Sequence, residues 1–179
     1  MNNLFYNIKH HIFPIGLILI LTFSRLIPHP PNFTPIIAIA MMSGYFFRNI
    51  YFSLGILLIS MLLADVFIGF YNNMIFVYLS LCLITFFFYK ISKMINLKNL
   101  FIFGFLGSLT FFIISNFGVW AMGSLGAYGI PYEKNLNGLM ECYILAIPFF
   151  GNTFLSTLIF SYSALVASKL YYKELFQKN

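Results

Sequence analysis

Three ionisable side chains lie inside apolar stretches of the sequence: Arg25, Asp65 and Glu141. An ionisable group inside a lipid bilayer costs about 2.5–3.5 kcal/mol on insertion scales, so each one needs a partner or a function. A guanidinium and two carboxylates can bind a polar ligand, and they can equally neutralise one another. These three residues therefore support two hypotheses equally. One is a ligand role, and the other is an Arg25–Asp65 ion pair between helices, or simple snorkelling of Arg25 to the interface.

Other polar residues recur at helical spacing near the C-terminal end. Glu141, Pro148 and Asn152 are seven and eleven residues apart, which places them within about 40° of one another on a helix. Pro148 removes one backbone hydrogen bond, and such breaks inside a membrane are tolerated where they line a cavity or another helix. This face is predicted to border a ligand site, with a packing kink as the commoner alternative.

Asn116 and Trp120 stand one helical turn apart and combine a hydrogen-bonding amide with a large ring. Such a pair is suited to a ligand site with apolar walls and a few placed polar groups. The alternatives are an interhelical hydrogen bond for Asn116 and a place in the interfacial aromatic belt for Trp120.

The elements that must position these residues are apolar segments. Hydrophobic residues make up 61% of the 179 residues and charged residues only 8%, whereas a soluble domain is about a quarter charged. Backbone groups in lipid must be hydrogen-bonded within their own segment, and the apolar runs lack the alternation of barrel strands, so we expect helices. We predict an all-α polytopic membrane protein in which residues 1–179 form one domain of six transmembrane helices, at 12–27, 34–47, 50–70, 74–89, 100–122 and 138–168. The first run lacks a small-residue cleavage site, so we expect it to be a retained helix.

The basic residues predict the orientation, because Lys and Arg gather on the cytoplasmic side of membrane proteins. With the N-terminus inside, eight of the ten fall on that side: Lys9, Arg48, Lys90, Lys93, Lys98, Lys169, Lys173 and Lys178. Only Arg25 and Lys134 fall on the other side. Both termini are therefore predicted to be cytoplasmic, and the net charge of +6 is explained as a topology signal.

Two of the predicted outer loops have distinctive compositions. Residues 28–35 contain four prolines and are expected to be stiff and extended. Residues 123–137 form the longest loop and carry three glycines before their proline, which is typical of a segment that moves as a lid. Within the helices, small residues four apart at Ala40/Gly44 and Gly104/Ser108 predict close helix contacts.

Motifs that are missing narrow the possible functions. The chain has no Gly-x-x-x-x-Gly-Lys-Ser/Thr loop for ATP. His10, His11 and His29 fall on opposite sides of the predicted membrane and cannot form one metal cluster, and no Ser/His/Asp set or paired-carboxylate motif is present. We therefore expect no enzymatic activity, no cofactor, no metal and no nucleic-acid partner.

Several motifs carry a resemblance to a known family. They are Arg25-Leu-Ile-Pro-His-Pro-Pro-Asn-Phe-Thr-Pro, Asp65-Val-Phe-Ile-Gly-Phe, Asn116-Phe-Gly-Val-Trp, Gly138 to Tyr143, and Ile147-Pro-Phe-Phe-Gly-Asn-Thr. Together they resemble an uncharacterised family of bacterial six-span transport proteins. That family is similar to the substrate-binding (S) components of energy-coupling factor (ECF) transporters, through six short helices, cytoplasmic termini and a Pro-Asn-x-Thr-Pro start of the second helix.

The resemblance implies a subunit of the bacterial cytoplasmic membrane that binds a vitamin or a similar small nutrient from outside. It also implies that a separate membrane coupling protein with two ATPase subunits supplies the energy. One departure is that many S components carry Ala-x-x-x-Ala in helix 1 for docking, where this chain has only Gly16. The predicted substrate site comprises Arg25, His29, Asn32, Thr34, Asp65, Asn116, Trp120, Glu141, Tyr143 and Asn152.

Two further hypotheses remain open from the sequence. One is an autonomous ion- or proton-coupled carrier in which Asp65 or Glu141 titrates during transport. The other is a noncatalytic membrane scaffold whose polar residues join helices and recruit a partner. The ligand's charge is also open, because Arg25 suits an anion, Asp65 and Glu141 suit a cation, and an Arg25–Asp65 pair suits a neutral molecule.

Overall fold

Six α-helices make up the described part of the chain. The computed structural model describes residues 2–47, 49–126 and 128–177, so Arg48 and Lys178 lie outside it, as do the side chains of Lys9 and His10. A short 3-10 turn, η1 (Ser92–Met94), separates the fourth and fifth helices. The helices are α1 (Asn2–Ser24), α2 (Ile36–Phe46), α3 (Ile50–Ile68), α4 (Met74–Ile91), α5 (Leu100–Met122) and α6 (Leu136–Gln177). The all-α prediction is confirmed for these residues.

The middle helices begin and end where the sequence places breaks. Asn49 caps α3, because its side-chain oxygen accepts hydrogen bonds from the backbone N–H groups of Tyr51 and Phe52. Gly123 ends α5 in the left-handed conformation, with φ 63°. The outermost helices differ from their predicted bounds. α1 and α6 continue into polar sequence beyond the apolar runs, since a helix does not need apolar residues outside the lipid.

The short helix α2 lies at the centre of the bundle. It packs against α1, α3, α4 and α6, and its residues from Ile37 to Gly44 are all buried. Thr85 of α4 donates a side-chain hydrogen bond to the carbonyl oxygen of Ala40 at 2.9 Å. Its eleven residues make a helix of about 16 Å, about half of the hydrocarbon thickness of a bilayer.

Four of the described helical segments are long and apolar enough to cross a membrane: Ile50–Ile68, Met74–Met94, Leu100–Met122 and Leu136–Lys173. Only 28–33% of their most apolar windows is buried within the protein. The exposed side chains include Ile59, Val66 and Phe67 of α3, which water would solvate poorly. These surfaces are suited to lipid, and the protein is membrane-embedded. The described segments His11–Ser24 and Ile36–Phe46 are apolar but shorter.

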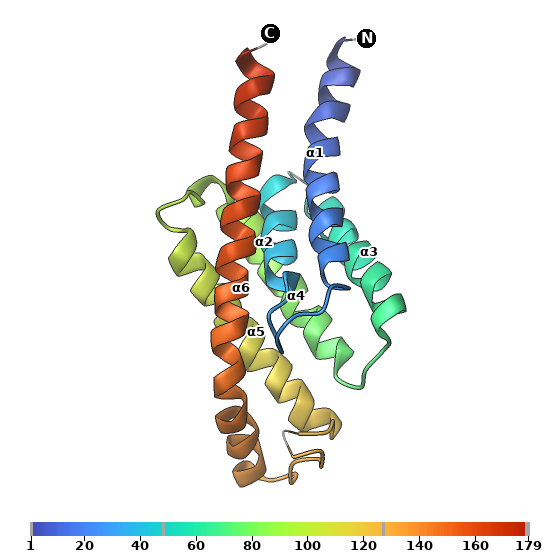
Figure 1. Ribbon diagram of the computed structural model, residues 1–179, viewed down its shortest axis with the longest axis vertical. Helices are drawn as coiled ribbons and strands as arrows, with labels where there is room; N and C mark the ends of the chain where they lie inside the picture. The colour runs from blue at the N-terminus through green and yellow to red at the C-terminus, as the bar shows by residue number, and fades with distance from the viewer. Residues whose placement is uncertain (1, 48, 127, 178–179) are drawn as a thin grey trace.

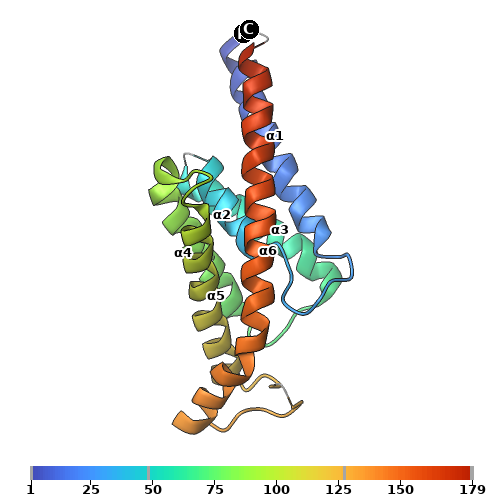
Figure 2. The same ribbon diagram turned by 60° about the vertical axis from the view of Figure 1, so that its left-hand side comes forward.

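The two termini lie at the same end of the bundle, where α1 and α6 extend beyond the other helices (Figure 1). The connections α1–α2, α3–α4 and α5–α6 lie towards the opposite end, which we name the distal end. Figure 2 shows α1 and α6 reaching the termini together, with α4 and α5 on another side of α2. The six helices thus return the chain to the end of the bundle at which it begins.

Candidate functional site

A buried ion pair joins the first and third helices near the distal end. The Arg25 guanidinium, just after α1, donates from Nη2 to Asp65 Oδ1 of α3 at 2.7 Å. The side chains are 8% and 0% exposed. Tyr78 of α4 donates its hydroxyl to the other carboxylate oxygen, also at 2.7 Å. The carboxylate thus has a charged and a neutral donor, which is what a buried charge requires.

A cavity of about 390 Å³ lies beside this ion pair, within the size range of small-molecule sites. Its polar lining comes from the α1–α2 and α3–α4 connections and from α5 and α6, and consists of Arg25, Asn32, Thr34, Tyr71, Asn73, Ser115, Asn116 and Thr153. Its apolar lining is half phenylalanine and consists of Ile36, Val77, Phe111, Phe112, Val119, Ala146, Phe149 and Phe150. Arg25 alone carries a formal charge among these residues.

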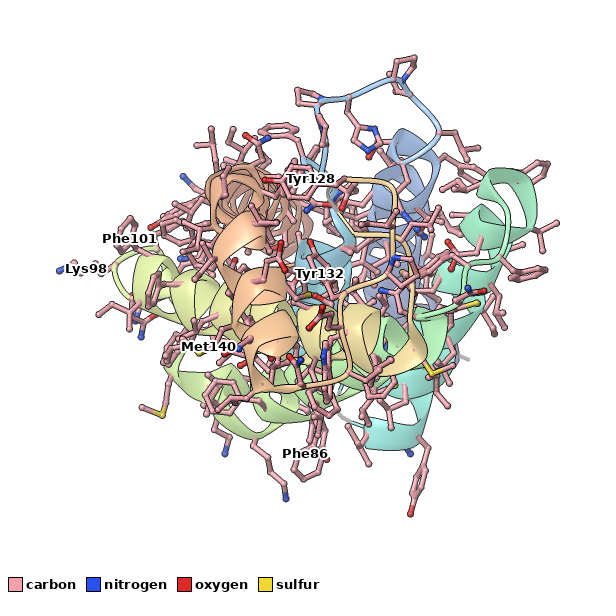
Figure 3. The ribbon with its side chains drawn as sticks, turned by 90° about the horizontal axis from the view of Figure 1, so that it is seen from below. Phe86, Lys98, Phe101, Tyr128, Tyr132 and Met140 are labelled. Atoms are coloured by element: carbon pink, nitrogen blue, oxygen red, sulfur yellow. The ribbon has the colours of Figure 1, made fainter. Side chains whose placement is uncertain are left out.

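A second hollow, of about 310 Å³, adjoins the first and shares Asn32 and Asn116 with it. Leu125, Gly126 and Tyr132 of the α5–α6 loop form one of its walls. Figure 3 views the protein from the distal end and shows this loop crossing the face of the bundle, with Tyr128 and Tyr132 on it. The loop that the sequence predicts to be a lid therefore lies beside the cavity.

Trp120 and Lys134 fasten this loop to the end of α5. The Lys134 ammonium donates to the carbonyl oxygens of Trp120 and Ala121 and stands 5.4 Å from the centre of the Trp120 ring. The Trp120 indole donates in turn to the carbonyl oxygen of Glu133 at 2.8 Å. A cation at the carboxyl end of a helix also complements the helix dipole. Trp120 therefore holds the loop and does not line the cavity.

Removing the Lys134 cation is expected to loosen the α5–α6 loop. In Lys134→Met, the carbonyls at the end of α5 lose their charged donor, and backbone amides of residues 124–135 should exchange with deuterium about tenfold faster. Hydrogen–deuterium exchange with mass spectrometry measures this change. Lys98→Met removes an exposed charge from the α4–α5 connection and is the control. Equal exchange in the two variants would contradict the fastening role.

The α1–α2 loop brings three predicted residues to the distal end in different settings. Asn32 lines both hollows and has a positive φ of 59°, which asparagine tolerates better than most residues. Asn152 of α6 donates to the carbonyl oxygen of Pro31 at 3.0 Å and so holds the loop. Thr34 lines the cavity. His29 is exposed, and its Nδ1 lies 2.6 Å from the carbonyl oxygen of Ile27.

The face of α6 that carries Glu141 and Pro148 points away from the cavity, and both residues are exposed. Tyr143 donates its hydroxyl to the carbonyl oxygen of Ile113 at 2.7 Å, which joins α6 to α5. The cavity is lined instead by the neighbouring face of α6, which includes Phe149 and Thr153. Figure 2 shows the first part of α6 tilted against the remainder, a bend that the proline accounts for.

Sequence reasoning missed the phenylalanine wall and Tyr71, Asn73, Tyr78, Ser115 and Thr153. The wall residues occur as two adjacent pairs, 111–112 and 149–150, but the chain has 24 phenylalanines and the pairs do not stand out. Tyr71 and Asn73 occupy a polar break between apolar runs, which was an available signal. Burial and then the charge of Asp65 raise the pKa of Tyr71 to about 12, so this phenol remains a donor at neutral pH.

A membrane-embedded helical bundle with a ligand-sized cavity at one end is the class of protein that the fold and site define. The chain belongs to a family of unknown function (DUF6580), whose sequence model matches residues 6–178. No curated protein and no solved structure matches the chain.

Proposed function

We propose that the protein is a substrate-capturing membrane subunit for the uptake of a small nutrient of the vitamin or micronutrient class. The observation that carries this proposal is the cavity at the distal end, where phenylalanines of α5 and α6 meet polar residues of the same two helices and of the α1–α2 and α3–α4 connections. Apolar walls with a few placed polar groups are typical of small-molecule sites. The site residues offer hydrogen bonds and charge, which suits binding rather than reaction.

In this proposal all six helices cross or enter the bacterial cytoplasmic membrane, and both termini are cytoplasmic. The distal end then faces outwards, so the cavity receives its ligand from outside. A separate membrane coupling protein with two ATPase subunits supplies the energy, as the resemblance to S components of ECF transporters implies. A Cβ atom added at Gly16 of α1 would meet nothing within 4 Å, which leaves room there for such a partner to approach.

The first test is gentle purification of the tagged protein from its native membrane, followed by mass spectrometry of retained small molecules and polypeptides. A stoichiometric small molecule, together with coupling and ATPase subunits, is the expected result. A stable partner without any ligand would instead support the membrane scaffold.

Asn116→Ala is expected to weaken ligand binding about tenfold, the effect of losing one or two hydrogen bonds. Among the described residues, the Asn116 side-chain nitrogen donates within its own helix, to the carbonyl oxygen of Phe112 at 2.8 Å, so the variant should fold. Glu141→Gln is the matched control, because Glu141 is exposed and lines neither hollow. Equilibrium dialysis with the retained ligand measures both affinities, and unchanged binding by Asn116→Ala would remove this residue from the site.

A second candidate is an autonomous carrier, which the complete burial of Asp65 favours. Both oxygens of this carboxylate are, however, already paired, with Arg25 and with Tyr78. Uptake by the purified protein alone in liposomes, driven by a pH gradient, distinguishes the carrier from the capture subunit. We expect no uptake into these liposomes when the coupling subunits are absent.

A further inference from the structure

We propose that the ligand is a singly charged organic anion. Its carboxylate-type group binds between Arg25 and the first turn of α2, and its apolar or aromatic body lies along the phenylalanine wall. This inference rests on the proposed capture function and names the class of substrate. Two donors of the cavity, independent of each other, lead to it.

The first donor is Arg25, which lines the cavity and is 92% buried. A guanidinium carries five N–H donors. Within the described residues, its acceptors are Asp65 Oδ1 and the sulfur of Met61, which is 3.5 Å from Nη1. Its Nε is buried without any hydrogen-bond partner. Buried donors of a charged group need acceptors, and the protein supplies fewer than the guanidinium requires.

The second donor is the N-terminus of α2. Thr34 and Ile36, on either side of the N-cap residue Pro35, both line the cavity. Pro35 is the N-cap and gives no side-chain hydrogen bond. The first hydrogen bond of the helix runs from the Ile39 N–H to the Pro35 carbonyl, so the three preceding N–H groups have no acceptor within the helix. Such a terminus favours anions.

The carboxylate of the ion pair, Asp65, does not face the cavity. Asp65 is fully buried and does not line the cavity. Both of its oxygens already accept hydrogen bonds, from Arg25 and Tyr78. A cationic ligand would therefore meet the guanidinium and the positive end of α2 without a facing carboxylate. The charges select an anion and reject a cation, which decides between the alternatives that the sequence leaves open.

The remainder of the cavity is shaped for an apolar body. Phe112 and Phe150, from α5 and α6, meet edge to face with ring centroids 5.4 Å apart. Rings in this arrangement present both faces and edges to a neighbouring flat ligand. Asn116 lines both hollows and supplies an amide for a second polar group of the ligand.

The test uses the full-length purified protein and three naphthalene derivatives that differ only in one substituent: a carboxylate, a carboxamide or an aminomethyl group. Equilibrium dialysis gives the three dissociation constants. We expect the carboxylate to bind at least about tenfold more tightly than the carboxamide, and the aminomethyl compound to bind most weakly. Tightest binding by the cation, equal binding of all three, or no binding by any of them overturns the proposed ligand class.

Two variants assign the selectivity to Arg25. Arg25→Lys keeps the charge but replaces the planar fork of five N–H donors with a single ammonium, and it should reduce the preference for the carboxylate about tenfold. If this variant does not fold, the double variant Arg25→Met with Asp65→Leu removes the whole pair without leaving a buried charge. It should also reduce the preference for the carboxylate at least about tenfold, to the part that the N-terminus of α2 supplies. An undiminished preference in either folded variant overturns the role of Arg25. If the molecule retained from the native membrane is a cation, capture stands and only the ligand class is overturned.

Discussion

Asp65→Ala is expected to lower the free energy of unfolding by about 3–5 kcal/mol, because it leaves the Arg25 guanidinium buried without its carboxylate. Arg25 is only 8% exposed, and its remaining partner is the weakly accepting sulfur of Met61. The variant also frees the Tyr78 hydroxyl, which donates to the same carboxylate. Chemical denaturation of the purified protein in detergent, followed by circular dichroism, measures the change.

The matched control replaces both members of the pair, as Arg25→Met with Asp65→Leu. Exchange of a buried ion pair for apolar residues of similar size is often neutral for stability, so this double variant should remain close to the parent protein. Tyr78→Phe removes one hydrogen bond to a charged group and should cost about 1–3 kcal/mol. If Asp65→Ala is as stable as the double variant, the pair does not hold the helices together.

Gly44→Ala is expected to lower the free energy of unfolding by about 2–3 kcal/mol through overpacking at the α2–α4 contact. A Cβ atom at Gly44 would overlap the carbonyl oxygen of Thr85 and stand 2.8 Å from the backbone nitrogen of Tyr89. These are backbone atoms in α4, so a side-chain rotation cannot relieve the overlap and the helices must separate. The same denaturation experiment detects the loss.

Gly55→Ala is the control for the change in helix propensity. A Cβ atom at Gly55 of α3 meets nothing within 4 Å, and alanine favours a helix over glycine by about 1 kcal/mol. This variant should be as stable as the parent or slightly more stable. Equal behaviour of the two alanine variants would contradict the close approach of α2 and α4.

The sequence predicted the helices whose ends carry local signals. Residues 100–122 coincide with α5, and the runs at 50–70 and 74–89 differ from α3 and α4 by two residues at one end. Asn and Gly residues mark those ends. The central position of α2 was harder to predict from the sequence, because the composition of this helix resembles that of its neighbours. Within α2, the Ala40/Gly44 spacing was the signal that indicated a close helix contact, and Gly44 does lie against the backbone of α4.

The site was predicted in part, for a physical reason. Four of the ten predicted residues line the main cavity: Arg25, Asn32, Thr34 and Asn116. Their polarity inside or beside apolar sequence made them visible. Phe149 and Phe150 were not visible, because lipid-facing and cavity-facing phenylalanines have the same sequence pattern in a membrane helix. Which α6 residues face the cavity also depends on the tilt of the first part of this helix. Glu141 and Pro148 lie on its exposed face.

The neutrality of the Arg25–Asp65 pair has an electrical consequence. An empty site with balanced charges exchanges no net charge with its surroundings, so the resting membrane potential does no work on it when the protein changes conformation. The anion that we propose as the ligand would add one negative charge to the same site. Carrying that charge inwards against an inside-negative potential costs about 2.3 kcal/mol per 100 mV. If the protein captures an anion for uptake as proposed, the loaded and empty proteins should differ in their response to voltage, and the energy source has to supply the difference on each inward step.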